Sequence, residues 1–313
     1  MSTVLSIVVP CYNEQDSIEP FLKTTCPILD NLASCDDWHI VLVNDGSSDE
    51  TLSRMREAHN NDPHVAYISF SRNFGKEAGL LAGMEKSLEL DATHVVVMDV
   101  DLQDPPSLLP QMLERLEATN CDIVATYRTT RAGEPPIRSW FARRFYELMG
   151  RFSDVEMRDG ARDYRIMTRR VVEAIVGMPE TQRFSKGLFA WVGYHTEWIG
   201  YENVERTTGE THWNFFSLFS YALDGIIAFS VAPLIFISLL GLTVFALAMV
   251  FLVFIFVRAL LFGDPVAGWP SLVCIVTLLS GLQLLSMGVL GLYLSKVYSE
   301  VKRRPMYLVA EES

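Results

Sequence analysis

The chain has 313 residues, half of them hydrophobic, and carries a formal net charge of −12 at pH 7. This length allows two ordinary domains, and the acidic balance argues against a nucleic-acid-binding protein, which needs a basic surface. The five cysteines show no paired metal-ligand spacing, which favours reduced thiols over a disulfide framework.

Strand-like and helix-like segments alternate over about the first 125 residues, which predicts an α/β fold with a mostly parallel sheet covered by helices. The predicted strands are Leu5–Pro10, His39–Asn44, Val65–Ser69, Thr93–Asp99 and Asp122–Tyr127. The predicted helices are Asp16–Asp30, Asp49–Ala58, Lys76–Leu90 and Pro106–Ala118. Right-handed crossovers would place the carboxyl ends of these strands on one edge of the sheet.

Polar sequences follow the first four predicted strands. They are VVPCYNE (residues 8–14), VNDGSSDET (43–51), SRNFGKEAG (71–79) and DVDLQDPP (99–106). Each loop alone is explained by helix capping, a turn or close helix packing. Because the loops meet at one edge of the sheet, together they predict a cleft of the size of a nucleotide.

The run from Val95 to Pro106, VVVMDVDLQDPP, carries the sharpest chemical signal. Its apolar start predicts a buried strand that delivers Asp99 and Asp101 to the edge where open α/β sheets bind ligands. Two carboxylates one residue apart suit Mg2+ or Mn2+, which proteins hold with one or two carboxylates plus the phosphates of a substrate. The alternative is a solvated acidic turn, because D-x-D patterns are common by chance.

Positive charge gathers further along the acidic chain. From Arg128 to Arg170 there are eleven arginines and no lysine against six acidic residues. The planar guanidinium group matches phosphate oxygens, so this window predicts a phosphate-bearing or membrane-surface partner.

The motifs VVPCYNE, VNDGSSDET and DVD resemble the nucleotide-binding loops and the D-x-D motif of the family-2 glycosyltransferases, which have a Rossmann-like GT-A fold. With DLQDPP, GARDYRIMTRRVVEAI, QRFSKGLFAWVGY and two apolar segments near its end, the chain looks more specifically like the polyprenyl-phosphate glycosyltransferases. That group includes bactoprenol glucosyltransferases and dolichol-phosphate mannose synthases. The resemblance implies inverting, metal-dependent transfer of one sugar from a nucleotide diphosphate sugar to polyprenyl phosphate.

On the donor side, the resemblance implies roles for individual residues. The donor-binding set is Pro10, Tyr12, Glu14, Asp45, Lys76, Asp99, Asp101 and Gln103. The first four would hold the base and ribose, and Lys76, with Arg72, would assist with the phosphates. Asp99 and Asp101 are the implied metal residues, with Asp101 ligating a Mg2+ or Mn2+ ion that bridges the diphosphate. Lys76 and Arg72 could equally be solvated cations at a helix end.

On the acceptor side, a lipid monophosphate is already mostly dianionic at neutral pH, so its attack needs cations more than a general base. The candidate phosphate-binding residues are Arg128, Arg131, Arg138, Arg183 and Lys186. The implied catalytic residues are Asp101, Arg128 and Asp163. Asp163 would orient the sugar or the acceptor phosphate, or stabilise positive character at the anomeric carbon. The alternative for Asp163 is an ion pair with Arg162 or Arg165.

The last third of the chain predicts a membrane part. Residues 226–257 and 265–295 contain no charged side chain, and each exceeds the ~20 apolar residues that cross a bilayer. The predicted organisation is a GT-A domain at 1–210, an interfacial amphipathic helix at 211–229, transmembrane helices at 233–257 and 270–294 within 230–295, and a cytoplasmic tail at 296–313. Where homologues carry a lysine in the motif ETHWN, this chain has His212, which puts a headgroup role there in doubt.

The two predicted transmembrane helices form a hairpin, and positive residues follow the second helix at Lys296, Lys302, Arg303 and Arg304. This charge pattern predicts a multi-pass inner-membrane protein with its catalytic domain on the cytoplasmic side. We also expect a homo-oligomer, a separate flippase and a downstream glycosyltransferase, but no nucleic-acid partner. UDP-glucose is the first candidate donor, with UDP-N-acetylglucosamine, UDP-galactose and GDP-mannose open. The alternatives are a processive polysaccharide synthase, which the missing Q-x-x-R-W motif disfavours, and a catalytically inactive nucleotide-sugar-binding scaffold.

Overall fold

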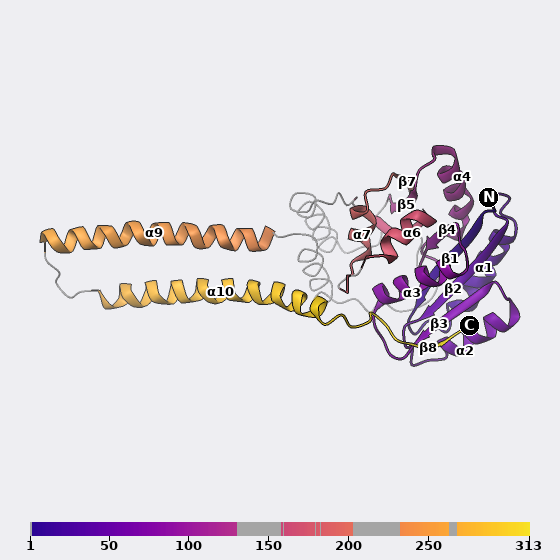
Figure 1. Ribbon diagram of the computed structural model, residues 1–313, viewed down its shortest axis with the longest axis horizontal. Coiled ribbons are helices and arrows are strands. Elements are labelled where there is room, and N and C mark those ends of the chain that lie inside the picture. Colours follow the sequence, from indigo (N-terminus) through magenta and orange to yellow (C-terminus); the bar gives the residue numbers. More distant parts are fainter. Residues whose placement is uncertain are drawn as a thin grey trace.

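The computed structural model describes residues 2–129, 158, 160–178, 180–181, 183–202, 232–262 and 268–313. These residues form a globular part and two long helices that extend from it side by side (Figure 1). Several predictions lie outside the described residues: those for Arg131, Arg138, His212 and the interfacial helix at 211–229.

A sheet forms the centre of the globular part, and its described strands have the order β7-β5-β6-β4-β1-β2-β3-β8. The strands are β1 (Val4–Cys11), β2 (Asp37–Asn44), β3 (Val65–Phe70), β4 (His94–Val97), β5 (Ile123–Arg128), β6 (Ala161–Thr168), β7 (Thr196–Tyr201) and β8 (Val309–Glu312). Strand β1 pairs in parallel with β2 and β4, and β2 with β3, which confirms the mostly parallel sheet. Strand β6 runs antiparallel between β4 and β5, so these two strands end at the same edge.

Helices cover both faces of the sheet (Figure 1). They are α1 (Ile18–Asp30), α2 (Thr51–Asn61), α3 (Lys76–Glu89), the 3-10 turn η1 (Pro106–Leu108), α4 (Leu109–Thr119), α6 (Arg169–Val176) and α7 (Ser185–Trp191). Helices α1, α2 and α4 pack on one face, with Ile7 and Val9 of β1, whereas α3, α6 and α7 pack on the face that Val8 enters. Side chains alternate along β1, and both faces are apolar because both are buried.

Helix α3 lies unusually close to β1. A Cβ atom on Gly83 would stand 2.2 Å from Cγ1 of Val8, and one on Gly79 would stand 3.3 Å from Cβ of Pro10. Glycine at these two positions therefore allows the close approach, as the sequence suggested. The consequence is that Lys76, the first residue of α3, lies at the sheet edge where the polar loops meet.

The predicted elements of the first 125 residues are all present, with ends that move by a few residues. The main correction concerns the strand predicted at Thr93–Asp99, because β4 ends at Val97. Asp99 and Asp101 therefore lie in the loop that follows the strand. That loop includes Leu102 in the left-handed region, with φ of 58°, which tightens the turn.

The carboxyl-terminal tail returns to the globular part and adds the antiparallel edge strand β8 to β3. Tyr307 stacks on Phe70 with ring centroids 4.8 Å apart, and its hydroxyl group bonds to Glu85 of α3. Glu311 accepts hydrogen bonds from Arg56 at 2.8 Å and from the Tyr67 hydroxyl at 2.6 Å. The tail, expected only as a cytoplasmic extension, is thus part of the central sheet.

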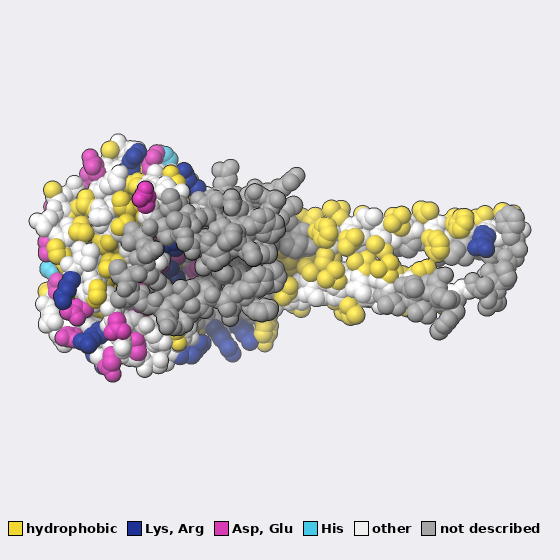
Figure 2. Space-filling model, turned by 180° about the vertical axis from the view of Figure 1, so that it is seen from behind, with side chains coloured by type: hydrophobic (Ala, Val, Ile, Leu, Met, Phe, Trp, Pro, Cys, Tyr) yellow, Lys and Arg dark blue, Asp and Glu magenta, His cyan; other side chains and the backbone are white. Residues whose placement is uncertain are grey.

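The two long helices are α9 (Ala232–Phe262) and α10 (Trp269–Val301). Figure 2 shows hydrophobic side chains over their described surface. By length and composition, one described stretch could cross a membrane, Leu278–Val301 in α10, and a shorter apolar stretch is Leu234–Val244 in α9. The predicted spans at 233–257 and 270–294 fall inside these two helices.

The docking of the tail should depend on pH. Hydrogen bonds from Arg56 and then Tyr67 lower the pKa of Glu311 from 4.5 to about 2. A carboxyl group with a lowered folded-state pKa stabilises the fold above its unfolded pKa and loses this effect as pH falls through its folded pKa. We expect the amide protection factors of β8 to fall between pH 4.5 and 2 in hydrogen-exchange measurements.

Two variants separate the titration of Glu311 from general unfolding in acid. Glu311→Gln should remove the pH dependence, whereas Glu312→Gln, on the neighbouring residue, should keep it. Identical pH profiles for the two variants would contradict the assignment to Glu311.

Candidate active site

The carboxyl ends of the parallel strands gather the predicted donor-side residues at one edge of the sheet. Pro10 is the penultimate residue of β1, Asp45 follows β2, and Arg128, a predicted phosphate-binding residue, ends β5. Loops from different strands are tied to each other, since the Asn13 side chain accepts the N–H of Ser48 at 2.9 Å. These contacts give the edge a fixed shape before any ligand binds.

The first loop offers an aromatic face and a half-buried carboxylate. Tyr12 is 50% exposed, so its ring is accessible for stacking on a base. Glu14 accepts a hydrogen bond of 2.6 Å from the Ser17 hydroxyl, and its N–H donates to Thr51 of the second loop. Both predicted residues therefore lie at the expected edge.

Asp45 links the second loop to the third. Its carboxylate accepts the N–H of Phe74 at 2.6 Å and the N–H of Gly75 at 3.0 Å. Burial raises the pKa of Asp45, and the two backbone bonds oppose that shift. Gly75 has φ of 96°, which favours glycine, and it leads directly into Lys76. Asp45 therefore also positions the start of α3.

Lys76 stands between two of the predicted carboxylates. Its ammonium donates to Asp99 at 2.7 Å and to Asp163 at 2.8 Å. Burial alone would lower the pKa of Lys76, but Asp163 and Asp99 outweigh burial and raise it well above its usual value. Burial would likewise raise the pKa of Asp163, and the charges of Lys76 and then Lys186 hold it well below its usual value. Lys76 and Asp163 are therefore both charged at neutral pH.

The structure corrects the alternative partner expected for Asp163. Successive side chains of β6 point to opposite faces of the sheet, so Arg162 lies on the face opposite Asp163. Arg165 shares the face of Asp163, but its guanidinium stacks on the Phe189 ring at 3.8 Å and donates to the backbone oxygen of Asp163. Neither arginine pairs with the Asp163 carboxylate, which binds Lys76 instead.

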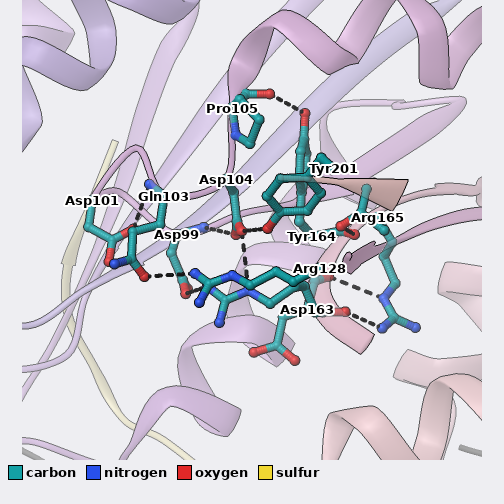
Figure 3. Close-up of polar contacts among 12 residues, drawn as sticks. Asp99, Asp101, Gln103, Asp104, Pro105, Arg128, Asp163, Tyr164, Arg165 and Tyr201 are labelled. Atoms are coloured by element: carbon teal, nitrogen blue, oxygen red, sulfur yellow. Dashed lines mark hydrogen bonds and ion pairs between the residues drawn. The ribbon is translucent and has the colours of Figure 1, made fainter. Parts of the chain in front are cut away.

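A buried network lies beneath the D-x-D loop (Figure 3). Asp104 is fully buried and accepts the Tyr201 hydroxyl at 2.8 Å and Nε of Arg162 at 3.4 Å. Burial raises the pKa of Asp104, and the charge of Arg162 opposes this rise. The Tyr164 hydroxyl donates to the backbone oxygen of Pro105 at 3.2 Å. The network holds the turn that follows Asp101.

Beside this network, Arg128 and Gln103 form a second polar contact. Nη2 of Arg128 donates to Oε1 of Gln103 at 3.0 Å, and the backbone N–H of Gln103 donates to the Asp101 carboxylate at 3.1 Å (Figure 3). The Nε atom of Arg128 is buried and has no hydrogen-bond partner among the described residues. A buried guanidinium N–H is costly to leave unpaired, so this atom fits an anionic group such as a phosphate.

The donor set also fits a divalent cation. Asp99 and Asp101 are hard oxygen ligands, and Asp101 is only 5% exposed. The described residues contain no group of three His, Cys, Asp or Glu placed to hold a metal. Two carboxylates completed by substrate phosphates are nevertheless a usual arrangement for Mg2+, which rarely takes an all-protein cage.

Two further predicted cations are Arg183, which lies between α6 and α7, and Lys186, which lies in the first turn of α7. Arg183 is 8% exposed and donates to the backbone oxygens of Met178 at 3.1 Å and Ile175 at 2.8 Å, so it caps the end of α6. This structural task leaves less of its guanidinium for a phosphate. Lys186 lies close enough to Asp163 to affect its pKa. The structure thus places Lys186 near the Asp163 carboxylate, whereas the guanidinium of Arg183 is bonded to backbone oxygens at the end of α6.

Sequence reasoning missed the contact between Asp104 and Tyr201, and it considered Arg162 only as a possible ion-pair partner of Asp163. Asp104 stands in DLQDPP, and its position before two prolines is the local sign that this loop is rigid. Tyr201 comes from β7, nearly one hundred residues along the chain, and no local pattern pairs it with Asp104.

Sequence comparisons with known proteins agree on one family. The model for Glycosyl transferase family 2 matches residues 6–176. An uncharacterized glycosyltransferase of Synechocystis is 38% identical over 99% of this chain and 96% of that protein. The SfII prophage-derived bactoprenol glucosyl transferase of Shigella flexneri is 37% identical over 97% of both. Among solved structures, glucosyl-3-phosphoglycerate synthase from Mycobacterium tuberculosis, with Mn2+ and UDP-glucose, is 17% identical, with a TM-score of 0.47 over 72% of this chain and 78% of that one.

The buried network predicts unequal effects of two substitutions. Asp104→Ala leaves the mostly buried Arg162 without its nearest carboxylate, and we expect a loss of about 3 kcal/mol in the free energy of unfolding. Tyr201→Phe removes one hydrogen bond to the same carboxylate and should cost about 1 kcal/mol. Denaturant titration of the full-length protein in detergent measures both. Equal losses would contradict the ion-pair role of Asp104.

Proposed function

Because the chain belongs to glycosyl transferase family 2 and is a glycosyltransferase, we propose that it moves one sugar from a nucleotide diphosphate sugar to polyprenyl phosphate. The relatives named bactoprenol glucosyl transferases support a lipid carrier and make glucose, from UDP-glucose, the first candidate sugar. The observation that carries the proposal is a buried N–H of Arg128 that lacks a partner among the described residues, on a guanidinium that donates to Gln103 in the loop that carries Asp99 and Asp101. Carboxylates beside a phosphate-seeking cation fit a diphosphate donor.

On the donor side, Tyr12 stacks on the base, and Pro10, Glu14 and Asp45 line the base and ribose. Asp99 and Asp101 would hold a Mg2+ or Mn2+ ion, with Gln103 beside them. When bound, this ion supplies electrostatic stabilisation of the negative charge that develops on the departing nucleoside diphosphate. Arg128 donates its unpaired N–H to a phosphate oxygen at the same place.

The transfer is a direct displacement. An oxygen of the dianionic acceptor phosphate forms a bond to the anomeric carbon, and the bond from that carbon to the diphosphate oxygen breaks. The electron pair leaves with the nucleoside diphosphate, so the configuration inverts. No proton has to be removed from the acceptor. Lys76 holds Asp163 ionised, and this carboxylate stabilises positive character at the anomeric carbon. Lys186 binds the acceptor phosphate. Further candidates for the same task are Arg131, Arg138 and Arg183.

We further propose that α9 and α10 form a two-helix membrane hairpin. Helix α9 contains one charged residue, Arg258, in 31 residues, and α10 contains the apolar stretch Leu278–Val301. Lys302, Arg303 and Arg304 are exposed at the end of α10 that is nearer the globular part. Because positive residues favour the cytoplasmic side of the inner membrane, we place the catalytic domain on that side. A homo-oligomer, a separate flippase and a downstream glycosyltransferase complete the proposal.

A transfer assay tests the reaction. We expect the purified full-length protein, with undecaprenyl phosphate and Mg2+ or Mn2+, to convert one labelled donor from a panel of UDP- and GDP-sugars into an anionic lipid product. EDTA should abolish the product. A preparation that binds nucleotide but yields no lipid product would contradict the proposal and favour a scaffold, whereas a growing polysaccharide would indicate a processive synthase.

Substitution of Asp101 tests the metal assignment. Asp101→Asn should lower kcat at least about a hundredfold, because a charged ligand next to the leaving group is lost. Asp91→Asn is the matched control, since Asp91 is an exposed turn residue with φ of 55° that asparagine adopts readily. Wild-type turnover in the Asp101 variant would remove it from the metal site.

A further inference from the structure

The last turn of α10 is attached to the globular part by a charged side chain. The Glu300 carboxylate accepts the backbone N–H of Thr181 with both oxygens, at N···O distances of 3.0 and 3.1 Å. Hydrogen bonds with a charged partner are roughly twice as strong as neutral ones. The apolar helix therefore holds the segment between α6 and α7 at a defined point.

From Thr181, the segment leads directly to the candidate active site. Arg183 fixes it to the end of α6 through its bonds to backbone oxygens. At the start of α7, the N–H of Ser185 donates to the Glu77 carboxylate at 2.9 Å, and the Ser185 hydroxyl bonds to the same oxygen. Glu77 is the neighbour of Lys76 in α3. The segment is thus held at three points, and Lys186 follows the last of them.

The chain that follows α10 is fixed to the globular part near helix α3, the helix that also binds Ser185 through Glu77. After α10 the chain turns at Arg303, with φ of 47°, and Leu308 accepts the N–H of Ser71 at 2.9 Å. Tyr307 bonds to Glu85 at the far end of α3. The end of α10 therefore cannot move relative to α3 without breaking contacts on both sides.

We propose that Glu300 is a positioning residue for the lipid acceptor, an inference that rests on the proposed function. A polyprenyl chain lies in the bilayer beside α10, and its phosphate has to reach the anomeric carbon at the sheet edge. Glu300 holds the segment that carries Lys186 at a fixed distance from the membrane end of α10. A displacement of about 1 Å in such an arrangement is enough to lower transfer markedly.

Kinetics of Glu300 variants in nanodiscs with undecaprenyl phosphate test this role. Glu300→Ala should raise the KM for undecaprenyl phosphate about tenfold, the loss expected for one hydrogen bond to a charged group, with the donor KM within about twofold. Glu300→Gln retains an oxygen that accepts the Thr181 N–H but loses the charge, so its acceptor KM should lie between those of the wild type and of Glu300→Ala. Glu117→Ala, an exposed glutamate on α4, is the control for loss of a surface carboxylate.

Amide hydrogen exchange of residues 180–188 gives a readout that needs no substrate. Exchange should accelerate most in Glu300→Ala and less in Glu300→Gln, and it should remain at the wild-type rate in Glu117→Ala. An unchanged acceptor KM in Glu300→Ala, an equal rise of the donor KM, or a Gln variant as impaired as the Ala variant would each overturn the inference.

Failure of the proposed function gives a different pattern. Wild-type protein would then form no lipid product with any donor, which removes the acceptor role of Glu300 as well. Unchanged exchange in Glu300→Ala, with wild-type lipid transfer intact, would overturn only the inference about Glu300.

Discussion

The ammonium of Lys76 between Asp99 and Asp163 is the contact on which the site depends. Carboxylates gathered at one sheet edge repel each other and lose hydration, and a cation between them offsets both costs. Its position follows from backbone features: Asp45 binds the N–H groups before α3, and Gly83 lets α3 lie against β1. The charge balance of the site is therefore built into the packing of one helix.

Strand β6 explains why the two sides of the site differ. It runs antiparallel between β4 and β5 and ends the purely parallel part of the sheet. Because its side chains alternate, Arg162 supports Asp104 under the D-x-D loop while Asp163 faces Lys76. One face of β6 stabilises the D-x-D loop, and the other carries the Asp163 carboxylate that binds Lys76.

The apolar helices and the globular part form one connected unit through α3. Glu300 binds the segment before α7, which binds Glu77, and Tyr307 binds Glu85. A short strand, β8, completes this attachment by pairing with β3. In the proposed reaction, such a fixed frame would set where the nucleotide sugar and the lipid acceptor meet.

The sequence by itself determined the parallel strands, the helices between them and the edge where Asp45, Asp99 and Arg128 gather, because buried strands, glycine turns and alternating elements are local patterns. Only the tertiary structure decided the partners of these side chains. Asp163 pairs with Lys76 rather than with Arg162 or Arg165, and Asp104 pairs with Tyr201, because β6 and β7 insert beside β4 and β5 from distant parts of the chain. The tail likewise joins β3, since pairing of a four-residue edge strand depends on its neighbour rather than on its own sequence.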